Sequence, residues 1–251
     1  MKTIVTWVWK GERAYTLEHA ASLAAGLRRF MTTPHRLVVI ADRPGRCEGA
    51  EVMRIPAAAL ALAKIKTPER ANFPSSYRRL WLFSEAARAI ADTILMVDVD
   101  VAVTGDWSHL FEYEPSENFM GWLPGQLWGN QEQRVGGGVW RLNTGTRTHV
   151  WDRFVEDPIS AVRRARSAGY RGSDQAWISY QLARSCPVWP NEVGIRSVRD
   201  FNRDDRRAIV GSIPEGTTMV HFNGVAKPWS LSTWKRHPWL KAYWEGEVEE
   251  P

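Results

Sequence analysis

Two acidic residues separated by a single position are the part of this sequence best suited to chemistry. Asp98 and Asp100 follow the apolar run 93–97, whose β-branched residues are typical of a buried strand. Alternate side chains of an extended chain point to the same side, so the two carboxylates would repel each other and lose hydration. A short motif of this kind is common in solvated turns, but here an apolar strand leads into it. The pair therefore predicts a divalent cation that holds a phosphate.

A second group of candidates lies in the segment HFNGVAKPW, residues 221–229. A lone histidine at a strand end is usually structural, but a neutral imidazole can also complete a metal site begun by two carboxylates. Gly224 would let the backbone approach a phosphate, and Lys227 would supply a point charge to a diphosphate. Together with the two aspartates, His221, Gly224 and Lys227 predict a clamp for a metal and a diphosphate.

The bulk composition is that of an ordinary globular chain. Its 251 residues, 44% hydrophobic and 24% charged, suffice for one large α/β domain or two small ones. No apolar run approaches the roughly 20 residues that span a bilayer, and the N-terminal segment is interpreted as a first strand instead of a signal peptide. We expect a cytoplasmic protein. Cys47 and Cys186 lack CxxC spacing, which argues against a zinc site and a disulfide scaffold.

Charge and aromatic content widen the list of partners without choosing among them. A net charge of +5 is compatible with a nucleotide, a nucleic acid or an anionic glycan. Arginines gather at 163–166 and 203–207, where solvated helix faces are the simpler interpretation. Tryptophan occurs 14 times, and most copies should be buried. The candidates for stacking on sugars or bases surround a glycine-rich stretch: Trp122, Trp128 and Trp140.

The order of predicted elements indicates an α/β fold. Apolar and β-branched runs predict strands at 3–9, 35–41, 51–55, 93–98, 136–140 and 218–222, and helical periodicity predicts helices at 16–30, 76–91, 147–154, 174–184 and 233–244. Strands that alternate with helices form mainly parallel sheets, whose ligands lie beyond the carboxyl ends of the strands. Asp98 and Asp100 fall at such an end.

Four blocks, in order, resemble the retaining GT-A-fold glycosyltransferases of the glycogenin and bacterial lipopolysaccharide galactosyltransferase group, family eight broadly taken. The blocks are SYRRLWL (76–82), LMVDVDVAV (95–103), GSDQAWIS (172–179) and HFNGVAKPW (221–229). The last matches an HxxGxxKPW pattern and is specific. The resemblance implies a GT-A fold: a Rossmann-like, mainly parallel central sheet flanked by helices, in one domain over 1–251. A nucleotide-binding lobe would span 1–106, and a donor-sugar and acceptor lobe would span 107–251.

The resemblance also implies roles for individual residues. Asp98, Asp100 and His221 would hold Mn²⁺ or Mg²⁺. Asp174 would accept hydrogen bonds from the donor sugar, and Gln175 would lie near the anomeric carbon. The implied donor-binding residues are Thr6 and Tyr15 at the nucleoside, Tyr77 in support of Arg79 at the donor, Asp98 at the ribose, and Gly224 and Lys227 at the diphosphate.

One stretch departs from the family pattern. The family carries an asparagine, a small residue and a glycine before the donor sugar, and this chain has Gly136, Gly137 and Gly138 there. A side-chain contact to the sugar is therefore missing. The segment 122–135 has no counterpart in the family and is interpreted as an acceptor loop.

The function implied by the resemblance is transfer of a hexose from a nucleotide sugar, a UDP-sugar, to an acceptor hydroxyl with retention. The acceptor would be a glycan or protein, or a hydroxymethylated base in DNA, as in phage-type DNA modification. Two alternatives stay open at this point. A metal-dependent nucleotidyltransferase would explain the aspartates but not HFNGVAKPW. A basic nucleic-acid-binding module without catalysis would explain the charge and tryptophans but not the buried aspartates.

Overall fold

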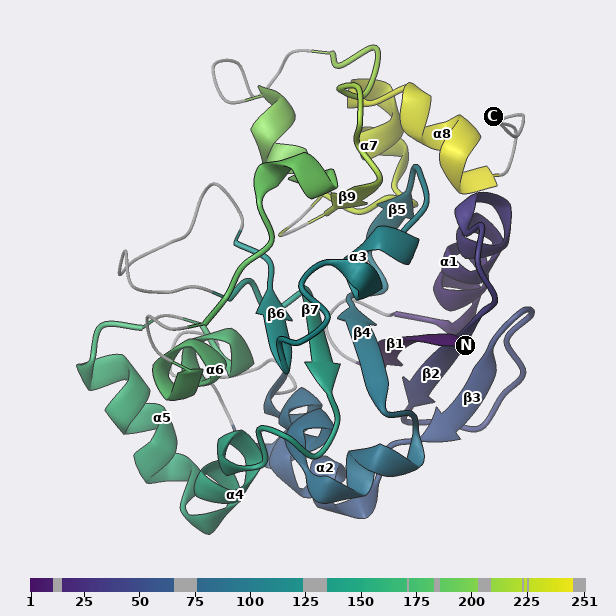
Figure 1. Cartoon of the computed structure of the whole chain (residues 1–251). Helices are drawn as coiled ribbons and strands as arrows, with labels where there is room; N and C mark the ends of the chain where they lie inside the picture. The colour runs from purple at the N-terminus through teal and green to yellow at the C-terminus, as the bar shows by residue number, and fades with distance from the viewer. Residues whose placement is uncertain are drawn as a thin grey trace.

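A six-stranded sheet forms the centre of the molecule in the computed structural model, which describes residues 1–10, 15–65, 76–123, 135–170, 172–182, 186–202, 209–222, 224 and 226–245 (Figure 1). Its strand order is β3-β2-β1-β4-β7-β6. The first four strands run parallel, and β7 is antiparallel to both of its neighbours. The predicted mainly parallel sheet is confirmed. The strands are β1 (Lys2–Val8), β2 (His35–Ala41), β3 (Glu51–Arg54), β4 (Thr93–Val97), β6 (Phe119–Gly121) and β7 (Val139–Asn143).

Helices cover both faces of this sheet, which is why the inner strands are apolar on both sides. Alternate residues of β1 enter two cores: Val5 belongs to one cluster and Ile4 to the other. The cluster with Ile4 is covered by α1 (Leu17–Phe30) and α3 (Ser108–Glu112). The cluster with Val5 is covered by α2 (Ala57–Ala61), η1 (Leu62–Lys64), η2 (Ser76–Phe83), η3 (Glu85–Ala89), α4 (His149–Glu156), α5 (Pro158–Ser167) and α6 (Asp174–Leu182).

A smaller, three-stranded sheet lies beyond the carboxyl end of β4. Its order is β5-β9-β8, from Val101–Val103, Met219–His221 and Ile195–Ser197. Two short 3-10 helices flank β8, η5 (Asn191–Val193) and η6 (Val198–Asn202). The chain then forms α7 (Leu231–Arg236) and α8 (Trp239–Glu245), and α8 lies beside α1 (Figure 1). Because β5 pairs with β9 and β4 pairs with β7, the segments 1–106 and 107–251 share both sheets.

The predicted helix over 76–91 is wrong in kind. The structure has two 3-10 helices there, η2 and η3, and every residue from Tyr77 to Phe83 is buried, Arg78 and Arg79 included. A segment buried on all sides takes its winding from its neighbours, so packing overrides the helical period of the sequence.

Three other boundaries also differ from the predictions. Gly136 to Gly138 precede β7 instead of lying in it. The predicted C-terminal helix is divided at Pro238, which lacks a backbone N–H and clashes with the preceding turn. None of the predicted helices covers 158–167, where the structure has α5, whose N-terminus is capped by Asp157 accepting from the Ser160 N–H at 3.1 Å.

Several composition-based expectations can be followed into the structure. The arginines at 163–166 lie exposed on α5, and the second arginine cluster, at 203–207, lies outside the described residues. Cys47 and Cys186 are buried free thiols. Within the described ranges, no helix is long and apolar enough to cross a membrane.

Candidate active site

Strand pairing brings together two segments that are more than a hundred residues apart in sequence. Asp98 and Asp100 lie between β4 and β5, directly after the carboxyl end of β4. In the small sheet, Val101 of β5 is the partner of His221 on β9, and the Phe222 N–H donates to the Asp100 carbonyl at 2.9 Å. The backbone of the two strands therefore places the histidine beside the aspartates.

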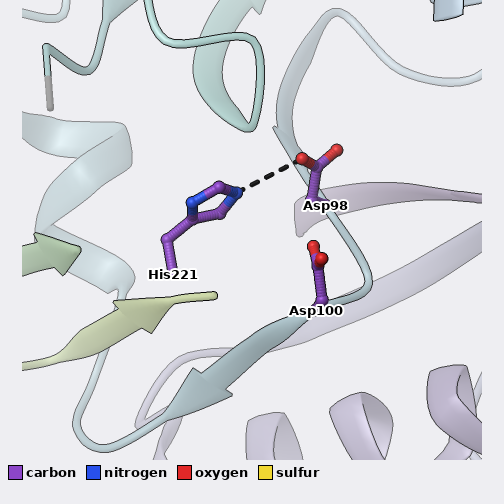
Figure 2. A group of neighbouring side chains, drawn as sticks. All are labelled: Asp98, Asp100 and His221. Atoms are coloured by element: carbon purple, nitrogen blue, oxygen red, sulfur yellow. Dashed lines mark hydrogen bonds and ion pairs between the residues drawn. The ribbon is translucent and has the colours of Figure 1, made fainter. Parts of the chain in front are cut away.

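These three side chains form a cluster with the composition of a metal site (Figure 2). Asp98, Asp100 and His221 each offer a ligand atom, and the atoms lie within 4.8 Å of one another. His221 Nε2 lies 3.2 Å from Asp98 Oδ2, and its ring meets the Trp122 ring edge to face at 5.3 Å. Its Nδ1 is buried and finds no hydrogen-bond partner among the described residues. Two carboxylates and an imidazole suit Mn²⁺ or Mg²⁺, so the residues fit the predicted ion.

Gly138 has to be a glycine because the side chains of the cluster press against it. A Cβ atom at this position would overlap His221 Nε2 and lie 2.9 Å from Asp98 Oδ2. The Asp98 N–H donates to the Gly138 carbonyl at 2.8 Å, which fixes the two backbones against each other. At Gly138 the atoms that approach the backbone closely therefore belong to the protein itself.

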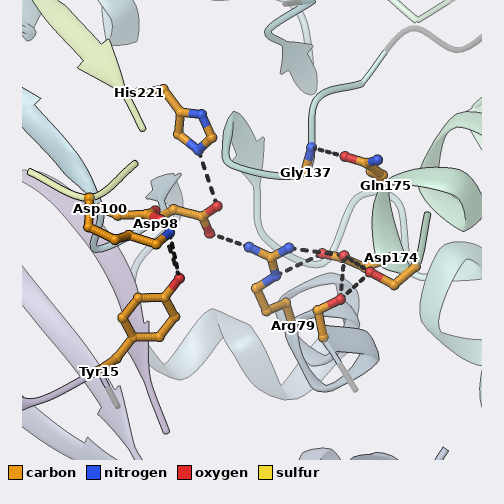
Figure 3. Close-up of polar contacts among 11 residues, drawn as sticks. Tyr15, Arg79, Asp98, Asp100, Gly137, Asp174, Gln175 and His221 are labelled. Carbon is orange, nitrogen blue, oxygen red and sulfur yellow. Dashed lines mark hydrogen bonds and ion pairs between the residues drawn. The ribbon is translucent and has the colours of Figure 1, made fainter. Parts of the chain in front are cut away.

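A buried arginine links the cluster to α6 (Figure 3). Arg79 donates to Asp98 Oδ1 through Nη1 and to Asp174 Oδ1 through Nη2, the latter at 2.9 Å, and its Nε lies 2.8 Å from Asp174 Oδ2. Burial alone would lower the pKa of Arg79, but the charges of Asp174 and Asp98 raise it above its ordinary value. Burial would raise the pKa of Asp98, and the charges of Arg79 and His221 and the hydrogen bond to His221 reverse this and lower it to about 2. Both groups therefore stay charged at neutral pH.

Asp174 and Gln175, at the start of α6, lie at different depths. Asp174 is buried, and its Oδ1 also accepts from Ser76 Oγ and Ser173 Oγ, both at 2.9 Å. Gln175 lines a cavity, and its Oε1 accepts from the Gly137 N–H at 3.1 Å (Figure 3). Sequence reasoning did not single out Ser76 and Ser173, because only their position beside a buried carboxylate reveals a role.

On the other side of the cluster, Tyr15 and Lys227 surround Asp100. The Lys227 ammonium forms an ion pair with Asp100 Oδ2 and donates to the Tyr15 hydroxyl at 3.0 Å. The Tyr15 hydroxyl in turn donates to Asp100 Oδ2 at 3.2 Å. Tyr15 was predicted at the nucleoside, and the structure places its hydroxyl against Asp100 and Lys227 and its ring edge-on to Trp229 at 5.8 Å.

The cluster and its neighbours Tyr15, Arg79, Gln175 and Lys227 line one cavity of about 230 Å³. Gly224 contributes backbone with a positive φ of 79°, a conformation that favours glycine. Thr6 and Tyr77 were also predicted at the donor, but both are buried in the core, Thr6 in β1 and Tyr77 against Phe154 at 4.8 Å. The described residues that line the cavity are Tyr15, Arg79, Asp98, Asp100, Trp122, Gly136, Gly137, Gly138, Gln175, His221, Phe222, Gly224 and Lys227.

The aromatic candidates separate according to this lining. Trp122 lines the cavity, whereas Trp140 is fully buried against Phe83 at 5.1 Å and belongs to the core. Trp128 and most of the predicted acceptor loop lie outside the described residues. Phe222 also lines the cavity without having been singled out, because its neighbours in HFNGVAKPW carry the polar chemistry.

Comparison with known proteins places the fold. No protein-family model matches the sequence, and no curated protein matches it significantly. Among solved structures, the galactosyltransferase LgtC in complex with donor and acceptor sugar analogues matches with a TM-score of 0.65 and 15% identity, over 99% of this chain and 97% of that one. The glycosyltransferase GlyE of Streptococcus pneumoniae TIGR4 matches with a TM-score of 0.64 and 13% identity, over 99% of this chain and 61% of that one.

A eukaryotic enzyme shows the same architecture. Mouse xyloside xylosyltransferase 1 matches with a TM-score of 0.54 and 14% identity, over 88% of this chain and 97% of that one. At these identities the similarity concerns the fold. The chain thus has the GT-A-type glycosyltransferase fold, as the sequence blocks led us to expect.

Proposed function

We propose that this protein is a metal-dependent glycosyltransferase that moves a hexose from a nucleotide sugar, a UDP-hexose, to an acceptor hydroxyl with retention. The observation that carries the proposal is the cluster of Asp98, Asp100 and His221 beside Lys227 in one cavity. That cavity lies beyond the carboxyl end of β4, where α/β sheets place their ligands. The fold similarity to glycosyltransferases supports the same conclusion.

Each side of the cavity has its part in binding the donor. Asp98, Asp100 and His221 would hold Mn²⁺ or Mg²⁺, which when bound would neutralise charge on the departing diphosphate. Lys227 and the Gly224 backbone bind the diphosphate, and Arg79 adds a fixed positive charge on the donor side. Asp98 also contacts the ribose. Behind these groups, Tyr77 supports the segment that carries Arg79.

The side chains favour attack on the same face as the leaving group. The carboxylates that line the described part of the cavity, Asp98 and Asp100, belong to the metal cluster, so neither is free to act as a nucleophile on the sugar. Gln175 lines the cavity with an uncharged polar side chain and would lie near the reacting carbon, and a mutated active-site glutamine is described in LgtC. Asp174 was expected to accept from a sugar hydroxyl, but it is buried outside the cavity lining and is paired with Arg79 through both of its oxygens, so it acts on the donor through Arg79.

The acceptor carries a hydroxyl on a glycan or a protein, or on a hydroxymethylated base of DNA. The exposed arginines of α5 and the net charge of +5 are what favour DNA. Binding to duplex DNA that weakens steeply as salt rises would support a DNA acceptor, because released counterions drive such binding. Absence of binding at low salt would leave glycans and proteins.

Product analysis tests the proposal directly. The protein is incubated with UDP-glucose or UDP-galactose and Mn²⁺, and released UDP and released hexose 1-phosphate are measured separately. We expect UDP, with release abolished by EDTA and by Asp98→Asn but retained in Asp152→Asn, a matched change on the exposed side of α4. Hexose 1-phosphate as the product would indicate transfer of the nucleotidyl group, and binding of nucleic acid with neither product would indicate a binding module.

A further inference from the structure

Lys227 has two possible anionic partners in the proposed active site, the Asp100 carboxylate and the diphosphate of the donor. In the structure it pairs with Asp100. Its ammonium is ion-paired with Asp100 Oδ2, and both side chains are more than nine-tenths buried. The Tyr15 hydroxyl contacts both members of this pair. It accepts from Lys227 at 3.0 Å and donates to the same Asp100 oxygen at 3.2 Å. Two donors on one oxygen occupy both of its lone pairs.

The backbone that carries Lys227 is fastened independently of this ion pair. The Lys227 N–H donates to Thr233 Oγ1 at 3.2 Å, and the Pro228 carbonyl accepts from Trp234 Nε1 at 2.6 Å. Trp229 stacks on His19 with the ring centroids 3.7 Å apart. The long side chain can therefore change partner by rotation of its own bonds while the main chain stays in place.

A divalent cation and this ammonium compete for the same carboxylate. A cation held by Asp98, Asp100 and His221 would lie next to the Lys227 ammonium, and like charges repel strongly in a buried site. Three carboxylates, those of Asp98, Asp100 and Asp174, face two positively charged side chains, Arg79 and Lys227. The net charge of these five groups is therefore −1. A divalent cation alone would make this site positive, and a diphosphate arriving with it would restore the balance.

We propose that Lys227 couples metal binding to nucleotide binding: its ammonium is the counter-ion of Asp100 until a diphosphate draws it away, so a divalent cation binds tightly only together with the nucleotide. Tyr15 is the positioning residue that holds Lys227 on Asp100. This inference rests on the proposed function, since it takes the diphosphate of the donor as the second partner. It predicts cooperative binding of the divalent cation and the nucleotide, which the three ligands Asp98, Asp100 and His221 alone would not produce.

Mn²⁺ binding, measured by the electron paramagnetic resonance signal of free Mn²⁺, tests the coupling without any turnover. In the wild-type protein, saturating UDP should tighten Mn²⁺ binding by about 5- to 150-fold, the usual range for coupled sites. In Lys227→Met, Mn²⁺ should bind more tightly than in the wild type when UDP is absent, and added UDP should change that affinity little. Lys241→Met, on the exposed face of α8, is the matched control and should behave as wild type.

A second variant keeps the test valid if Lys227→Met does not fold. Tyr15→Phe retains every charge and removes only the hydroxyl, so it should raise Mn²⁺ affinity without UDP by a smaller factor. Mn²⁺ affinity in the absence of UDP that is unchanged or lower in both folded variants would overturn the coupling while leaving the proposed function intact. A wild-type protein that binds neither Mn²⁺ nor UDP, alone or together, would overturn both.

Discussion

Asp98 is the residue on which the charges of the site converge. It pairs with Arg79 through one oxygen and with His221 through the other, and these contacts hold its pKa at about 2. The same carboxylate is a proposed metal ligand. Its ionisation therefore matters both to the stability of the fold and to binding of the cation.

The depressed pKa of Asp98 makes a prediction about acid stability. A carboxyl group with a pKa of about 2 in the folded chain and about 4 in the unfolded chain stabilises the fold above pH 4, and this contribution is lost as the pH falls toward 2. Between about pH 6 and pH 3, the free energy of unfolding should fall by on the order of 1 kcal/mol more in the wild type than in Asp98→Asn. Urea denaturation at the two pH values measures this difference, and equal losses in the two proteins would argue against the assignment.

Gly138 gives a second prediction at the scale of one residue. In Gly138→Ala the new methyl group would displace His221 or Asp98, so Mn²⁺ binding should weaken by at least about tenfold, which corresponds to roughly 1.4 kcal/mol. Gly211→Ala is the control, because a Cβ there meets nothing within 4 Å. Titration of Mn²⁺ in the presence of UDP measures the effect. Binding as tight as in the wild type would contradict a metal site formed by Asp98 and His221 beside Gly138.

At the scale of elements, one buried arginine fastens the connection between α3 and β6. Arg141 on β7 is 1% exposed and is surrounded by main-chain oxygens. Its guanidinium contacts the segment 110–117, which connects α3 to β6, so it holds this connection against β7. It donates to the carbonyls of Leu110, Phe111, Tyr113, Glu114 and Glu117.

Replacement of Arg141 by methionine should therefore destabilise the whole chain. The change leaves five buried or half-buried carbonyls without their donor, and the expected loss in the free energy of unfolding is several kcal/mol, on the order of 3–5. Arg153→Met, on the exposed side of α4, should cost little. Chemical denaturation of the two variants gives the comparison. Equal stability of both would mean that the carbonyls find water or other partners.

The elements also show what a sequence can and cannot predict. The strand before Asp98 was predictable because its residues are apolar on both faces, and the position of His221 followed from a second strand end. The winding of 76–83 was not, because a segment buried on every side follows its neighbours. The link from Arg79 to Asp174 and the contact of Tyr15 with Lys227 join residues far apart in sequence, and their partners are set by packing.

At the scale of the whole molecule, each of the two sheets positions a different part of the site. The large sheet holds Asp98 at the end of β4, and the small sheet brings His221 to it, with Lys227 following six residues later. Neither half of the chain contains the site by itself, because each sheet takes strands from both halves. Metal and nucleotide together should therefore stabilise the entire fold.

The thermal melting temperature with and without ligands tests the central claim most directly. Ligands that bind only the folded state raise this temperature. UDP-glucose or UDP-galactose with Mn²⁺ should raise it by several degrees in the wild type, and either component alone, or both with Asp98→Asn, should raise it much less. A shift of equal size with EDTA, or no shift with any nucleotide sugar in the presence of Mn²⁺, would contradict a metal-dependent nucleotide-sugar site.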